Sequence, residues 1–204
     1  GVLHDLQGRE RHEDVRDSTI RRFVQRYDVD LEQALRVERT ALYLLQRVAE
    51  GWELSDPADA RLLRWVSRLH EIGMAVNYTA YQKHGAYLLR NSHMPGFSRN
   101  ERQRLAALVR FQRRKTTGSD LSEFPALAQR RYLRLATLLR LAVLLNRARR
   151  ARPLPYFGVA AEGEAITLRF EADWLEEHPL TRADLELETQ NLADVGITLT
   201  VAED

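Results

Sequence analysis

The stretch RLHEIGMAVNYTAYQKHGAYLLRNS, residues 68–92, carries most of the information about the fold. It places His70 next to Glu71, and a second histidine, His84, follows in the next predicted helix. Histidines and carboxylates on neighbouring helices outline a metal site. The stretch therefore indicates an α-helical protein, and the rest of the chain decides whether the ligand set is complete.

Outward from this stretch, apolar residues recur at helical spacing as far as about residue 152. Three start signals support the pattern, namely the capping boxes Asp30–Gln33 and Ser98–Glu101 and the N-cap with proline at Asp56–Pro57. We expect helices at 11–27, 31–50, 57–73, 79–91, from 98 to about 116, and from 125 to before Pro153.

The pattern changes after Pro153. Alternating apolar residues at 165–170 and 196–201 predict strands, and Thr181, three residues before Asp184, predicts the start of a helix between them. The predicted fold class is mainly α, a helical bundle over 11–152 with a small C-terminal α+β appendage over 153–204.

Composition sets the outer limits on function. The 204 residues are 44% hydrophobic, lack cysteine and contain no apolar run long enough to span a membrane, so we expect a cytoplasmic protein without disulfides. The net charge of +2 hides an asymmetry: residues 99–152 hold 15 basic and 3 acidic residues, whereas 154–204 hold 2 and 12. A concentrated basic field attracts polyanions, and arginine forks suit phosphate.

The histidine–carboxylate pattern resembles the HD superfamily of metal-dependent phosphohydrolases. That resemblance implies a ligand set that is incomplete here. The superfamily's first histidine falls at Gln33, its paired aspartate at Glu71, its late aspartate at Val143, and a further histidine at Gln112. The resemblance therefore implies a degenerate HD-like bundle with no metal, in which His70 and Glu71 form a buried, mutually hydrogen-bonded pair.

A narrower resemblance covers essentially the whole chain. Residues 68–92, with DVRDS at 14–18, MPGFS at 94–98 and LVRFQRRK at 108–115, resemble the C-terminal half of bacterial exopolyphosphatases and guanosine pentaphosphate phosphohydrolases. This implies that two actin-like ATPase-fold domains, which carry the Mg²⁺ site and the catalytic glutamate, precede a linker at 1–10. We expect the present part to be inactive alone.

The resemblance also implies a role. We expect the domain of an exopolyphosphatase that binds inorganic polyphosphate and supports a homodimer. The predicted phosphate contacts are Arg110, Arg113, Arg114, Lys115, Lys83, His84 and Arg90, with a further group at Arg147, Arg149, Arg150 and Arg152.

Three alternatives remain. Within the family, the substrate of the whole protein is either polyphosphate or guanosine pentaphosphate. An RNA- or DNA-binding helical module fits the charge, but the basic region has few aromatic residues for stacking, so we expect neither a nucleic-acid nor a membrane partner. An active HD phosphohydrolase is disfavoured by Gln33 and Val143, which supply no anionic ligand.

Overall fold

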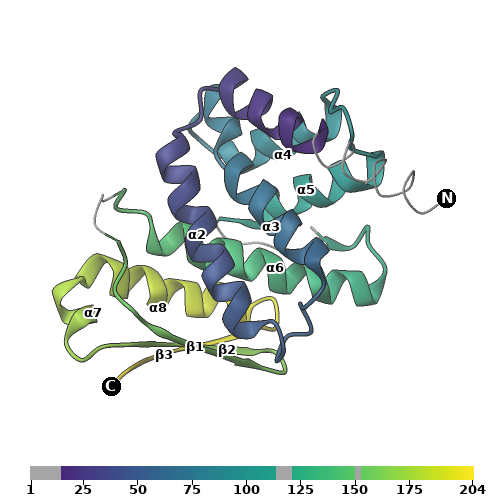
Figure 1. Ribbon diagram of the computed structural model, residues 1–204. Coiled ribbons are helices and arrows are strands. Elements are labelled where there is room, and N and C mark those ends of the chain that lie inside the picture. The colour runs from purple at the N-terminus through teal and green to yellow at the C-terminus, as the bar shows by residue number, and fades with distance from the viewer. Residues whose placement is uncertain (1–14, 114–120, 150–152) are drawn as a thin grey trace, which may run out of the picture.

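The computed structural model describes residues 15–113, 121–149 and 153–204, and shows a helical bundle resting on a small sheet (Figure 1). The bundle comprises a helix at 15–26, α2 (Leu31–Val48), α3 (Pro57–Leu69), the 3-10 helix η1 (Ile72–Ala75), α4 (Tyr81–Asn91), α5 (Arg99–Phe111) and α6 (Ala126–Leu145). The C-terminal part comprises β1 (Gly158–Glu162), β2 (Ala165–Phe170), α7 (Trp174–Glu177), α8 (Pro179–Ala193) and β3 (Thr198–Glu203). The predicted fold class is confirmed. The predicted linker at 1–10 lies outside the described residues, and the boundary at 152–153 stays a prediction.

The predicted start signals are largely confirmed. The Asp56 side chain accepts the Ala58 N–H, and Ser98 and Glu101 form the complete reciprocal capping box of α5. At α2, only half of the predicted box forms. Asp30 accepts the Gln33 N–H at 3.0 Å, but the Gln33 side chain reaches the Asn146 carbonyl instead. This diverted glutamine links the start of α2 to the end of α6.

The helix predicted to run from 57 to 73 is shorter than expected. α3 ends at Leu69, His70 is its C-cap, and η1 follows after Glu71. The turn is tight because the chain at Gly73 approaches the next helix closely: a Cβ added there would lie 1.9 Å from the Tyr81 carbonyl oxygen. His70 and Glu71 therefore lie at the end of a helix, at its junction with α4, rather than within a continuous helix.

A single apolar core joins the bundle to the sheet. α6 runs through it, with Leu135, Leu138 and Leu141 fully buried, and the core continues into Ile166 and Leu168 of β2. Each fully buried leucine stabilises the fold by about 1.5–3 kcal/mol relative to exposure. Among the described helices, none is long and apolar enough to cross a membrane.

The sheet has the order β1-β2-β3, with β1 and β2 antiparallel and β2 and β3 parallel. α7 and α8 form the crossover between the parallel pair, as a parallel connection requires. The sequence did not predict β1 or α7. The predicted helix start at Thr181 is wrong, since α8 begins at Pro179, where the proline occupies the first turn and needs no N–H partner.

Candidate functional site

His70 lies in the middle of the bundle and is completely buried. Its Nδ1 lies 2.6 Å from the Ser67 carbonyl, so this nitrogen carries the proton and donates it. Burial lowers the pKa of His70, which keeps the ring neutral. Nε2 then presents a lone pair, and it has no hydrogen-bond partner. The nearest Glu71 oxygen is 3.8 Å from Nε2, so the predicted mutual hydrogen bond is wrong: the carboxylate has a stronger partner elsewhere.

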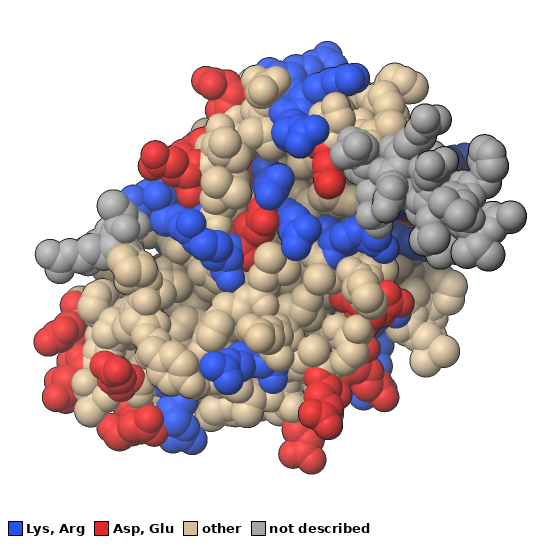
Figure 2. Space-filling model, in the orientation of Figure 1, with Lys and Arg blue, Asp and Glu red and all other residues tan. Residues whose placement is uncertain are grey.

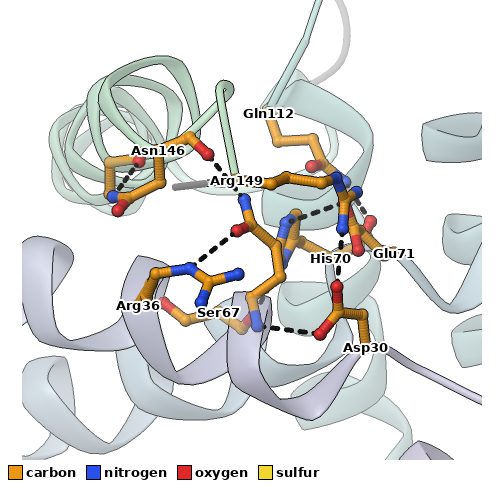
Figure 3. Close-up of polar contacts among 10 residues, drawn as sticks. Asp30, Arg36, Ser67, His70, Glu71, Gln112, Asn146 and Arg149 are labelled. Carbon is orange, nitrogen blue, oxygen red and sulfur yellow. Dashed lines mark hydrogen bonds and ion pairs between the residues drawn. The ribbon is translucent and has the colours of Figure 1, made fainter. Parts of the chain in front are cut away.

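The positions expected to have lost metal ligands, Gln33, Gln112 and Val143, line one cavity together with Glu71. Figure 3 shows Gln112 and Glu71 near His70. Gln33 donates to the Asn146 carbonyl at 2.8 Å, and Gln112 donates to the His70 carbonyl at 2.6 Å. Val143 faces the same cavity but has no polar atom. The side-chain amides of Gln33 and Gln112 serve as cross-links between helices rather than as metal ligands. Within residues 15–113, 121–149 and 153–204, no group of three or more His, Asp or Glu side chains could hold a metal ion.

Arg149 occupies the centre of this cluster. Its guanidinium donates to the Glu71 carboxylate through Nη2 and to Asp30 at 3.0 Å through Nη1 (Figure 3). Arg149 follows α6 on the segment that leads to the sheet, and it has a positive φ of 50°, which is uncommon for arginine. It was expected as a phosphate contact, and the structure pairs it with two carboxylates of its own chain instead.

A cavity of about 250 Å³ opens above this cluster. It lies where α6, α8, the end of α5 and the start of α4 meet. Its charged and aromatic lining residues are Glu71, Tyr78, Tyr81, Arg113, Arg140, Arg147, Arg149, Asp184 and Glu188. Two ion pairs hold α8 at this cavity: Arg140 with Glu188, where both side chains are buried, and Arg147 with Asp184.

Arg113 differs from the other arginines of the cavity. Its guanidinium carbon lies 5.1 Å from the centre of the Tyr81 ring, and it has no carboxylate partner among the described residues. Burial raises the pKa of Tyr81, so its hydroxyl stays neutral and leaves the charge of Arg113 uncompensated. Tyr78 lies 6.1 Å from Tyr81 between ring centres and is 69% exposed. The cavity thus offers an uncompensated guanidinium beside an accessible aromatic ring.

The acidic appendage neutralises much of the basic run within the same chain. Four arginines of α6 or its end pair with acids of the C-terminal part: Arg130 and Arg134 with Glu164, Arg140 with Glu188, and Arg147 with Asp184. In Figure 2, Lys and Arg side chains form a band across the middle of the face, while Asp and Glu gather along the lower edge near the sheet and α8. Part of the charge asymmetry of the sequence therefore forms ion pairs that join the helical bundle to the C-terminal part.

The predicted phosphate contacts do not form one cluster. Arg113 lines the cavity, whereas Arg110 is half-buried on α5. Lys83 and His84, in the first turn of α4, are exposed and half-buried. Arg90 lies at the opposite end of α4, about 14 Å from Tyr81 at the helical rise, and pairs with Glu123 at 2.9 Å. Arg114, Lys115, Arg150 and Arg152 lie outside the described residues.

The fold and site define a class: a mainly helical domain with a small appended sheet, in which side-chain hydrogen bonds around a buried histidine link the helices. The family model described as Ppx/GppA phosphatase, domain III, matches residues 15–189, and the chain belongs to this family. It is similar to proteins named guanosine-5'-triphosphate,3'-diphosphate pyrophosphatase, with 37% identity to that of Pseudoalteromonas translucida, 35% to that of Vibrio vulnificus and 33% to that of Aeromonas hydrophila. These matches cover 96–98% of this chain and 40% of each relative. The chain therefore spans less than half the length of these relatives.

Proposed function

We propose that this chain is the C-terminal part of a phosphohydrolase that acts on guanosine pentaphosphate, and that it binds the substrate without cleaving it. The names of the three relatives support the nucleotide substrate, which was the alternative to polyphosphate in the sequence analysis. The family resemblance supports the division of labour, in which Mg²⁺ and the catalytic glutamate belong to preceding domains.

The observation that carries the binding role is Arg113 beside Tyr81 and Tyr78. A guanidinium without a carboxylate partner binds a phosphate oxygen pair in bidentate fashion, and an exposed tyrosine ring stacks on a base. The cavity of about 250 Å³ is at the small end for ligand sites, so it suits one phosphate and the adjoining ring rather than a whole nucleotide. Other contacts to the substrate come from elsewhere in the protein.

Inorganic polyphosphate is the second candidate, and the basic run supports it. Arg110 and Arg113 are followed directly by Arg114 and Lys115, and Lys83 lies on the neighbouring helix. A phosphate chain needs such a series of cations and no aromatic ring. Because its binding releases counterions, its affinity falls steeply with salt concentration.

One pair of variants separates the two substrates. We expect Tyr78→Ala to weaken guanosine pentaphosphate binding about five- to a hundredfold, the usual range for one stacked base, and to leave polyphosphate binding unchanged. Arg113→Ala weakens both ligands, and Arg90→Ala serves as the control because Arg90 is already paired with Glu123. Equilibrium binding by calorimetry at two salt concentrations measures all three variants.

Two outcomes contradict the proposal. If Arg113→Ala and Arg90→Ala bind both ligands as the wild type does, the cavity is not the binding site. If mixed-sequence oligonucleotides bind more tightly than either phosphoanhydride, the chain is a nucleic-acid-binding module. The homodimer implied by the resemblance is part of the same proposal, and the mass of the chain in solution by light scattering tests it.

A further inference from the structure

Hydrogen-bond acceptors from several elements gather at the cavity and next to it, with Glu71 and Gln112 in its lining. His70 Nε2 carries a lone pair, is fully buried and has no partner. The Gln112 amide oxygen is also buried without a partner, because its nitrogen is used on the His70 carbonyl. The Glu71 carboxylate lies 3.8 Å from His70 Nε2, and the Asp30 carboxylate binds the same arginine, Arg149, as Glu71 does. An imidazole lone pair and two carboxylates are the donor set that binds divalent metals.

One cation of the chain itself lies among these acceptors. The Arg149 guanidinium bridges Asp30 and Glu71 (Figure 3). The two carboxylates belong to different elements, the N-cap of α2 and the turn after α3, and Arg149 comes from the segment after α6. Because Glu71 is buried, leaving its carboxylate without a cation is strongly unfavourable, so this ion pair is a requirement of the site.

We infer that Arg149 is an internal substitute for a divalent metal ion, and that its guanidinium keeps the cluster in a metal-free, closed state. The fixed positive charge compensates the carboxylates that a metal would otherwise compensate. With the guanidinium between them, Asp30 and Glu71 are held apart and cannot converge on one ion, which agrees with the lack of a metal-binding group in the described residues.

We therefore predict that the single substitution Arg149→Ala creates a metal site. Removing the guanidinium leaves a neutral imidazole beside the buried, uncompensated Glu71 carboxylate, and it frees the Asp30 carboxylate. His70 Nε2 and Glu71 Oε1 are 3.8 Å apart, close to the separation of about 3.4 Å that two ligands have on a tetrahedral zinc ion. Asp30, which Arg149 also binds, is the candidate for a third ligand, and water from the adjoining cavity supplies a fourth.

Arg149 also has a structural task. Together with the Gln33–Asn146 contact, it links the segment after α6 to the His70 cluster, and it follows the last residue of α6 by four residues. The ion pairs tie the connection between bundle and sheet to the start of α2 and the end of α3. The backbone of Arg149 has a positive φ of 50°, which is unfavourable for a residue other than glycine, so surrounding contacts must hold it there. This role does not depend on which phosphoanhydride the whole protein hydrolyses.

The test is zinc titration of the 204-residue chain by calorimetry. We expect Arg149→Ala to bind one Zn²⁺ per chain at least tenfold more tightly than the wild type. The double variant Arg149→Ala/His70→Ala should return to the wild-type level, which excludes binding by histidines elsewhere. Arg147→Ala is the matched control, because Arg147 is a nearby arginine whose partner is Asp184 rather than the His70 cluster.

Each outcome decides the inference. If Arg149→Ala folds, as judged by circular dichroism, and binds zinc no better than the wild type or Arg147→Ala, the inference is wrong. It is also wrong if the gain persists without His70. If Arg149→Ala is unfolded in the absence of metal, the inference requires that Zn²⁺ restore its helical signal, and failure to restore it overturns the inference.

Discussion

The arginines that line one cavity are used in opposite ways. Arg140 and Arg149 each pair with carboxylates of the same chain, whereas Arg113 lies over the Tyr81 ring with no carboxylate partner among the described residues. Residues of the same type, within one cavity, therefore serve different purposes. The partner of an arginine, rather than its position in a basic run, distinguishes a structural cation from one available to a ligand.

The largest effect is expected at Arg140. Arg140→Met leaves Glu188 buried without its cation, which costs about 3–5 kcal/mol in the free energy of unfolding. Chemical denaturation measures this difference. The double variant Arg140→Met/Glu188→Leu should recover most of the loss, because it removes both charges together. If Arg140→Met were as stable as the wild type, the Arg140–Glu188 ion pair would not stabilise the fold at this cavity.

The next effect is expected at Gly73, whose lack of a side chain lets the start of α4 approach. Gly73→Ala should lower the free energy of unfolding by about 1–3 kcal/mol, because the added methyl group overlaps the Tyr81 carbonyl. Since Tyr81 supports Arg113, ligand binding should weaken as well. Gly163→Ala is a comparison variant, since a Cβ there meets no atom within 4 Å, although its positive φ of 58° adds backbone strain. If Gly73→Ala binds the ligands as the wild type does, ligand binding at Arg113 does not depend on the contact between Gly73 and Tyr81.

A smaller effect is expected at Asp30, which caps α2 and pairs with Arg149. Asp30→Ala should cost about 1 kcal/mol, the usual value of an N-cap, while Asp30→Asn should cost less because asparagine also caps helices. Denaturation of both variants at neutral pH measures the difference. Equal losses in the two variants would assign the effect to charge rather than to the cap.

The Asp30 contribution also has a defined pH dependence. The hydrogen bond from the Gln33 N–H, followed by the nearby Arg149, lowers the pKa of Asp30 below its ordinary value of 3.8. A lowered folded pKa stabilises the protein above the unfolded pKa, and this contribution is lost as the pH falls through the folded pKa. The stability difference between wild type and Asp30→Ala should be constant above about pH 5 and shrink below about pH 4. A constant difference down to pH 2 would contradict the lowered pKa.

The smallest effect on stability is expected for Arg113. Arg113→Ala should change the free energy of unfolding by no more than about 0.5 kcal/mol, because it leaves no buried carboxylate unpaired. The same variant should weaken phosphoanhydride binding. A loss of stability as large as that of Arg140→Met would show that Arg113 has a structural role, as Arg140 and Arg149 do.

Local signals in the sequence predicted the local structure well. The capping box of α5 and the N-cap of α3 depend on residues three or fewer apart, and both formed as expected. The family resemblance correctly gave the mainly helical fold, and in the structure Gln112 donates to the His70 carbonyl. The end of α3 was misplaced because it is set by the close approach of Tyr81 to Gly73, a tertiary contact that leaves no helix-stop signal.

The role of Arg149 was not predictable from the sequence for a related reason. Its partners Glu71 and Asp30 lie 78 and 119 residues away, and in the sequence Arg149 is one member of a basic run. The acidic C-terminal part likewise gave no sign that it would neutralise α6 within the same chain, as Arg140 and Glu188 do. The sequence shows how many charged residues each segment holds, and only the fold shows which of them form ion pairs.

The central claim is that this chain holds a phosphoanhydride beside a closed cluster that does not hydrolyse it. Phosphate release from guanosine pentaphosphate by the 204-residue chain, with Mg²⁺ or Mn²⁺ in excess, tests this claim most directly. The account predicts no release above that of the His70→Ala variant, because Arg149 occupies the cluster and the two positions expected to hold metal ligands are Gln33 and Val143. Release that is abolished both by a chelator and by His70→Ala would contradict it.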